Sequence, residues 1–119
     1  MTSDPTLDPG GIERLLEITG GDVAFVDELI DTYLQDAALQ LDLLRDASVA
    51  GDVTALVRPA HSLKSSSDSV GAVALTGLCR ELEAQARGGA VADPGRRVAA
   101  IADAFEAVRR GLLAARGRS

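Results

Sequence analysis

The chain has 119 residues, enough for one compact domain that removes about two-thirds of the unfolded chain's surface from water. Hydrophobic residues make up 46% of it, but Phe25, Tyr33 and Phe105 are the only aromatic ones, so small aliphatic side chains must fill the core, which favours packed helices over strands. Its net charge of −6, without any basic stripe, argues against sequence-independent binding to nucleic acid.

Glycine and proline divide the chain into helical segments. A short helix is predicted from Ile12, before Gly20–Gly21. Asp22 is then a good N-cap for a long helix of about seven turns. Its apolar residues recur at steps of three and four: Val26, Ile30, Tyr33, Ala37, Leu41 and Leu44.

Three further helices follow. Gly51–Asp52 separates the long helix from a third one, whose apolar residues are Val53, Leu56, Val57, Ala60, Leu63, Ser67 and Val70. Gly71 precedes a fourth helix, which contains Leu75, Leu78, Cys79, Leu82 and Ala86 and ends at Gly88–Gly89. Asp93 is the predicted N-cap and Pro94 the first residue of the last helix, which contains Val98, Ile101, Ala102, Phe105, Val108 and Leu112.

Short connections make successive helices antiparallel neighbours. The sequence therefore predicts an all-α fold, an up-down antiparallel four-helix bundle with a short extra N-terminal helix. We expect a single domain over residues 1–119, with a core from about residue 12 to residue 113 and frayed ends at residues 1–8 and 115–119.

Several classes of protein and site are not expected. One cysteine cannot form an internal disulfide, which fits a reducing compartment. We see neither a signal peptide nor an apolar run near the roughly 18 residues of a membrane helix, and we expect a cytoplasmic protein without a membrane partner. One histidine and one cysteine cannot supply a conventional zinc site, and no phosphate-binding loop occurs, so we expect no bound metal or cofactor.

His61 is the only histidine, so histidine chemistry must use it. On a helical wheel it points about 120° away from the middle of the apolar stripe of its helix. Arg58, Ser65 and Asp68 share this outward side, and Lys64, the only lysine, lies one turn further on. A mobile ammonium suits a phosphoryl group, although one lysine can also fall near one histidine by chance.

Longer motifs extend this pattern over most of the chain. Residues 60–67 read Ala-His-Ser-Leu-Lys-Ser-Ser-Ser, residues 70–72 Val-Gly-Ala, and residues 78–83 Leu-Cys-Arg-Glu-Leu-Glu. With the upstream residues Gly20–Asp22, Phe25, Glu28–Ile30, Tyr33–Leu34 and Gly51–Asp52, the chain resembles the histidine-containing phosphotransfer (HPt) domain family from about Ile12 to Leu112.

The resemblance implies a phosphoryl carrier of a multistep His-Asp phosphorelay in two-component signal transduction. His61 would be the phosphoacceptor, Lys64 would stabilise the phosphoryl charge, and Arg58, Ser65 and Asp68 are candidates for the docking surface. The implied partners are receiver domains of response regulators, which bring their own Mg²⁺, and a hybrid sensor histidine kinase. We expect a monomer without a nucleotide site or kinase activity, and therefore not an enzyme.

Two residues depart from the family pattern. Ser65 replaces the usual glycine after the lysine, and its hydroxyl is a possible ligand of the phosphoryl group. Pro59 replaces a helix former two residues before His61, and we expect it to kink the helix and alter the docking geometry.

Other interpretations stay open. A docking module that is never phosphorylated would have no need of both His61 and Lys64, and an enzyme with His61 as its base lacks a second catalytic group. The setting is also open: a free-standing chain, which the initial methionine favours, a piece of a hybrid kinase, or the front of a chemotaxis-type kinase. We expect Cys79 to be a core residue, and Glu81 and Glu83 to belong to an exposed charged face.

Overall fold

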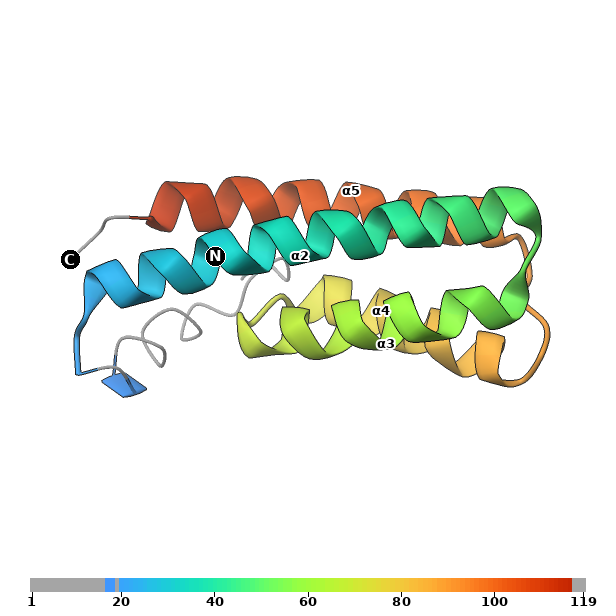
Figure 1. The fold of residues 1–119 in the computed structure, drawn as a ribbon, viewed down its shortest axis with the longest axis horizontal. Helices are drawn as coiled ribbons and strands as arrows, with labels where there is room; N and C mark the ends of the chain where they lie inside the picture. The colour runs from blue at the N-terminus through green and yellow to red at the C-terminus, as the bar shows by residue number, and fades with distance from the viewer. Residues whose placement is uncertain (1–16, 19, 117–119) are drawn as a thin grey trace, which may run out of the picture.

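The computed structural model of the protein describes residues 17–18 and 20–116. In this part of the chain it has four helices: α2 (Val23–Ala50), α3 (Val53–Ser69), α4 (Val73–Arg87) and α5 (Pro94–Ala115). Each helix packs chiefly against two others, in the cyclic order α2, α3, α4, α5 (Figure 1). The predicted antiparallel four-helix bundle is confirmed.

The chain ends contain predictions that the structure does not reach. The short helix predicted from Ile12 lies outside the described residues except for Glu17 and Ile18, and so do the predicted frayed ends except for Ala115 and Arg116. Among the helices that are described, none has the length and apolar character that a membrane span requires.

All three predicted N-caps are correct in position, and two of them make the side-chain hydrogen bond. The carboxylates of Asp22 and Asp52 accept hydrogen bonds from the backbone amides three residues later, at 3.0 and 3.1 Å. Asp93 is the N-cap of α5 and Pro94 is its first residue, as predicted, but the side chain of Asp93 makes no capping hydrogen bond. Its φ of 52° is left-handed, whereas a capping side chain is normally aimed at the first turn by an extended backbone.

The predicted apolar stripes form the core. All six residues of the stripe in α2 are buried, as are the central residues of the other three stripes. Cys79 is fully buried in this core, as predicted, and burial raises the pKa of its thiol to about 12. Ser67 lies on the buried side of α3, where its hydroxyl is satisfied by a 2.8 Å hydrogen bond with the Tyr33 hydroxyl of α2.

Pro59 lies inside α3, where it is buried, and the helix continues through it from Val53 to Ser69. A proline at this position has no amide hydrogen for the carbonyl of Ala55 and its ring crowds that carbonyl. The packing of α3 against α2 and α4 therefore keeps it helical, although the hydrogen bond to the Ala55 carbonyl is missing.

Substitution Pro59→Ala should raise the free energy of unfolding by about 1 to 2 kcal/mol, because the restored helical hydrogen bond outweighs the lost packing of the ring. Urea denaturation would measure this change. Pro94→Ala is the matched control, since a proline in the first turn removes no helical bond, and it should bring no gain. A loss of stability in Pro59→Ala would show that the packing of the ring is the larger effect.

Candidate functional site

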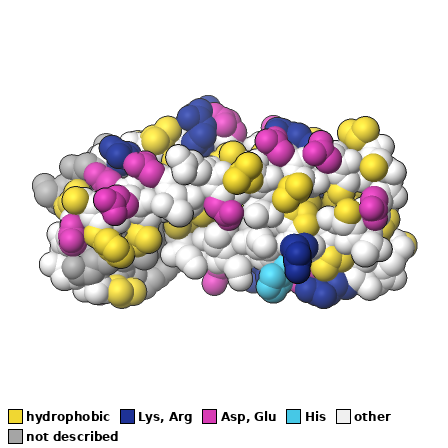
Figure 2. Space-filling model, viewed as in Figure 1, with side chains coloured by type: hydrophobic (Ala, Val, Ile, Leu, Met, Phe, Trp, Pro, Cys, Tyr) yellow, Lys and Arg dark blue, Asp and Glu magenta, His cyan; other side chains and the backbone are white. Residues whose placement is uncertain are grey.

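His61 lies on the outer side of α3, and 51% of its side-chain surface is exposed. The predicted position outside the core is therefore correct. Arg58, Ser65 and Asp68 are also exposed, as their positions on the helical wheel predict. In Figure 2 the imidazole, in cyan, lies at the edge of the molecule beside basic side chains.

Glu83 of α4 is the residue that the sequence analysis placed wrongly. It is buried, with only 6% of its surface exposed, and it is the only charged residue among the buried ones that the structure describes. Its Oε2 lies 2.9 Å from Nδ1 of His61, and its Oε1 lies 2.6 Å from Nζ of Lys64. Arg87, one turn later in α4, donates to Oε2 at 2.8 Å.

The helical positions explain both this arrangement and the error. Glu83 follows Thr76 by seven residues, and both lie at the border of the apolar stripe of α4, where the helix meets α3. A charged residue there is usually exposed, so composition favours a surface position. The available signal was the heptad spacing from Thr76, together with basic residues on the facing helix.

The three cationic or hydrogen-bonding partners keep Glu83 ionised. The hydrogen bond from Lys64 is the largest cause that lowers its pKa to about 2, and those from Arg87 and His61 act in the same direction, while burial opposes them. An ionised carboxylate has no proton to donate. Nδ1 of His61 must therefore carry the hydrogen of the 2.9 Å bond, and in the neutral imidazole Nε2 keeps its lone pair.

The predicted proximity of Lys64 and His61 is correct, with Glu83 as their common partner. The side chain of Lys64 is 26% exposed, and its ammonium pairs with one carboxylate oxygen while the imidazole binds the other. The site thus consists of a half-exposed imidazole whose Nδ1 is bound to a buried carboxylate, and Lys64 and Arg87 compensate the charge of that carboxylate. Such second partners commonly set the tautomer and orientation of a working histidine.

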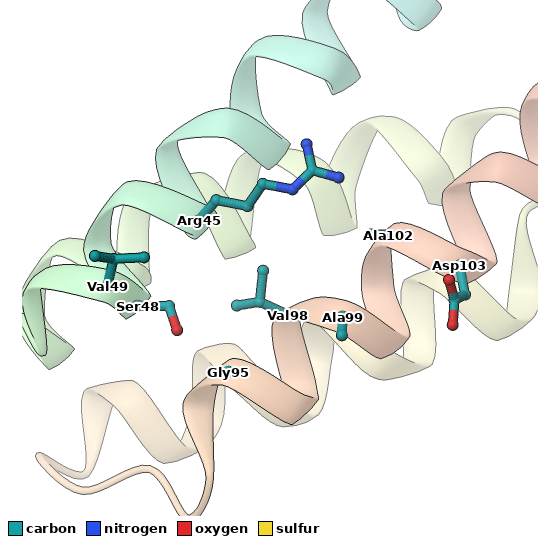
Figure 3. Close-up of a pocket in the computed structure, with 8 residues that line it drawn as sticks. All are labelled: Arg45, Ser48, Val49, Gly95, Val98, Ala99, Ala102 and Asp103. Atoms are coloured by element: carbon teal, nitrogen blue, oxygen red, sulfur yellow. The ribbon is translucent and has the colours of Figure 1, made fainter.

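No other part of the described chain has comparable chemistry. No group of three or more histidine, cysteine or acidic residues within it is placed to hold a metal ion. A hollow between α2 and α5 is lined mainly by small and apolar residues, with Arg45 and Asp103 at its borders (Figure 3). Arg45 pairs with Asp42 of its own helix at 3.4 Å, which is the interaction of an ordinary surface residue.

Comparisons with known proteins agree with this site. A family model for the Hpt domain matches residues 28–111. The chain belongs to the Hpt domain family. Its structure is similar to the crystal structure of histidine-containing phosphotransfer protein B from Pseudomonas aeruginosa PAO1, with a TM-score of 0.88 and 34% sequence identity over 98% of this chain and 99% of that one. No curated protein matches significantly.

Acid unfolding should report the burial of Glu83. Because its pKa is lower in the folded chain than in the unfolded one, its contribution to stability is complete above about pH 4.5 and is lost as the pH falls towards 2. Glu83→Gln should lower the free energy of unfolding at pH 7 by about 1 to 3 kcal/mol and flatten its decline between pH 4.5 and 2.

Urea denaturation at pH 7, 4.5, 3 and 2 would measure both effects. The matched control is Glu81→Gln, two residues away on the exposed side of α4, which should decline with pH as the unsubstituted chain does. Parallel declines for Glu83→Gln and the unsubstituted chain would contradict a depressed pKa at Glu83.

Proposed function

We propose that His61 is the phosphoacceptor of this phosphorelay carrier, taking a phosphoryl group from the aspartate of one receiver domain and passing it to another. Members of the Hpt family are phosphotransfer carriers, and they interact with response-regulator receiver domains. The observation that carries the assignment to His61 is its exposed ring, whose Nδ1 is bound to ionised Glu83 and whose Nε2 is left with its lone pair.

Nε2 is suited to attack the phosphorus of an aspartyl phosphate. As the new N–P bond forms, the bond between phosphorus and the aspartate oxygen breaks, and the aspartate leaves as a carboxylate. Nε2 has no proton to release, and Nδ1 keeps its hydrogen, so the phosphorylated ring becomes cationic. The carboxylate of Glu83 at 2.9 Å stabilises this positive charge. Transfer to the next receiver reverses these steps.

Lys64 and Arg87 contribute positive charge on the Glu83 side of the imidazole ring. Both contact Glu83, at 2.6 and 2.8 Å, so together they more than neutralise its carboxylate and leave a net positive surrounding for the phosphoryl oxygens. We assign Lys64 this stabilising role. Its ammonium need not leave Glu83 entirely, because an ammonium has three donors.

The described residues supply a nucleophile and charge, and the sequence has no phosphate-binding loop for a nucleotide, which supports a partner as the source of the phosphoryl group. The receiver brings the aspartate and Mg²⁺, and this chain acts as a carrier without ATP-dependent turnover. We expect it to work as a cytoplasmic monomer, since transfer needs one carrier and one receiver.

His61→Gln should abolish phosphate acceptance from phosphorylated receivers and shift the melting temperature by less than about 3 °C, because the side chain is half exposed and glutamine can still donate to Glu83. Transfer would be followed with labelled phosphate, and folding by circular dichroism. Ser62→Ala, at the next position, is the control for the labelling.

Three outcomes would contradict the proposal. Label on the glutamine variant would place the phosphoryl group elsewhere. Unfolding of that variant would contradict the exposed position of His61. Binding of receivers to the unsubstituted chain without any labelling would support a docking module instead.

A further inference from the structure

A polar hollow between α3 and α4 lies beside the proposed phosphoacceptor. It is lined by Lys64, Ser65, Asp68, Ser69, Thr76 and Arg80. Lys64 belongs both to this hollow and to the ion pair with Glu83, so the hollow is continuous with the His61 site. Ser65 follows His61 by one turn of α3, and Arg80 precedes Glu83 by one turn of α4. A receiver domain that covers His61 therefore also covers this hollow.

The hydrogen-bonding groups of the hollow are not all available. The hydroxyls of Ser69 and Thr76 donate to backbone carbonyls at 3.2 and 2.7 Å, and Lys64 pairs with Glu83. In contrast, the side chains of Arg80 and Ser65 make no hydrogen bond or ion pair with the part of the chain that the structure describes. The remaining donors of Lys64 are assigned to the phosphoryl group. The other available donors are thus the guanidinium of Arg80 and the hydroxyl of Ser65, at the His61 end of the hollow.

Arg80 differs in this respect from Arg87, the other arginine of α4. Arg87, seven residues later, is bound to the buried carboxylate of Glu83. Asp68 lines the hollow with Arg80, yet the two form no ion pair. Two rigid donor edges of Arg80 are therefore free for an acceptor from outside the chain, and a guanidinium binds a carboxylate in a two-pronged geometry.

We propose that this hollow is a specificity pocket that binds a carboxylate side chain on the surface of the receiver domain, with Arg80 and Ser65 as its donors. The inference rests on the proposed function, because the receiver is the partner that covers His61. Arg80 would thus select among receivers by the position of an acidic residue on their docking surface. It is a binding residue that contacts the partner and not the reacting atoms.

A carboxylate fits the hollow better than the phosphoryl group itself. Asp68 contributes a negative charge to the lining, and it repels a phosphoryl dianion more strongly than a carboxylate of single charge. One carboxylate can accept both prongs of the Arg80 fork and the hydroxyl of Ser65.

The test compares Arg80→Gln and Arg80→Glu with Arg110→Gln, an exposed arginine of α5. Binding of each unphosphorylated receiver that recognises the unsubstituted chain is measured by calorimetry. We expect the dissociation constant of at least one receiver to rise about tenfold in Arg80→Gln, because charge-assisted hydrogen bonds are lost. It should rise further in Arg80→Glu, because the new carboxylate repels the acidic side chain of the receiver. Arg110→Gln should leave it unchanged.

A charge exchange identifies the occupant. Each acidic residue on the receiver's docking surface is replaced by arginine, and one such variant should bind Arg80→Glu more tightly than it binds the unsubstituted chain. Unchanged binding in Arg80→Glu, or no exchange that restores it, would overturn the proposal. The rate of His61 phosphorylation in Arg80→Gln is also compared for phosphorylated receivers and for phosphoramidate, a small phosphoryl donor. An equal loss of rate with both donors would show that Arg80 acts on the phosphoryl group, and it would also overturn the proposal.

These measurements separate the inference from the function on which it rests. Binding is measured without phosphoryl transfer, so receivers that bind through Arg80 but never phosphorylate His61 would support the pocket and contradict the carrier. Phosphorylation of His61 by receivers whose binding ignores Arg80 would support the carrier and contradict the pocket.

Discussion

A buried carboxylate is the constraint on which the site depends. Removing an ion from water costs several kcal/mol unless the protein replaces its hydrogen bonds, and Glu83 recovers this cost through His61, Lys64 and Arg87. The same contacts that stabilise Glu83 fix the imidazole and decide which of its nitrogens carries the hydrogen. The stability of the bundle and the reactivity of its surface histidine are thus joined in one set of bonds.

The bundle provides this arrangement with few residues. Gly71, at a φ of 75°, turns the chain tightly between α3 and α4, so the two helices run antiparallel with their borders in contact. Residues 61 and 83 then face each other although 22 positions separate them. A rigid pair of helices holds the ring better than a loop would, and the partner can supply the remaining catalytic groups.

Most of the fold was predictable because the apolar residues repeat with the period of a helix and because glycine and aspartate mark the helix ends. The exposed position of His61 followed from the same period. The burial of Glu83 did not, because helical patterns assign a charged border residue to solvent unless its partners on another helix are known. Asp93 was placed correctly as the N-cap of α5, but the absence of its side-chain bond has a local cause, the left-handed backbone, which the sequence does not show. The availability of Arg80 and Ser65 in the hollow depends on which donors are already bonded, and the sequence does not show that.

The central claim is that Glu83 binds the hydrogen on Nδ1 of His61 and so leaves Nε2 as the nitrogen that accepts the phosphoryl group. The most direct measurement is to phosphorylate the protein with a receiver, using protein labelled with ¹⁵N in its histidine ring, and to identify the phosphorylated nitrogen by ³¹P and ¹⁵N magnetic resonance. The account predicts phosphorus on Nε2, with the hydrogen still on Nδ1. Phosphorus on Nδ1, or on any residue other than His61, would contradict it.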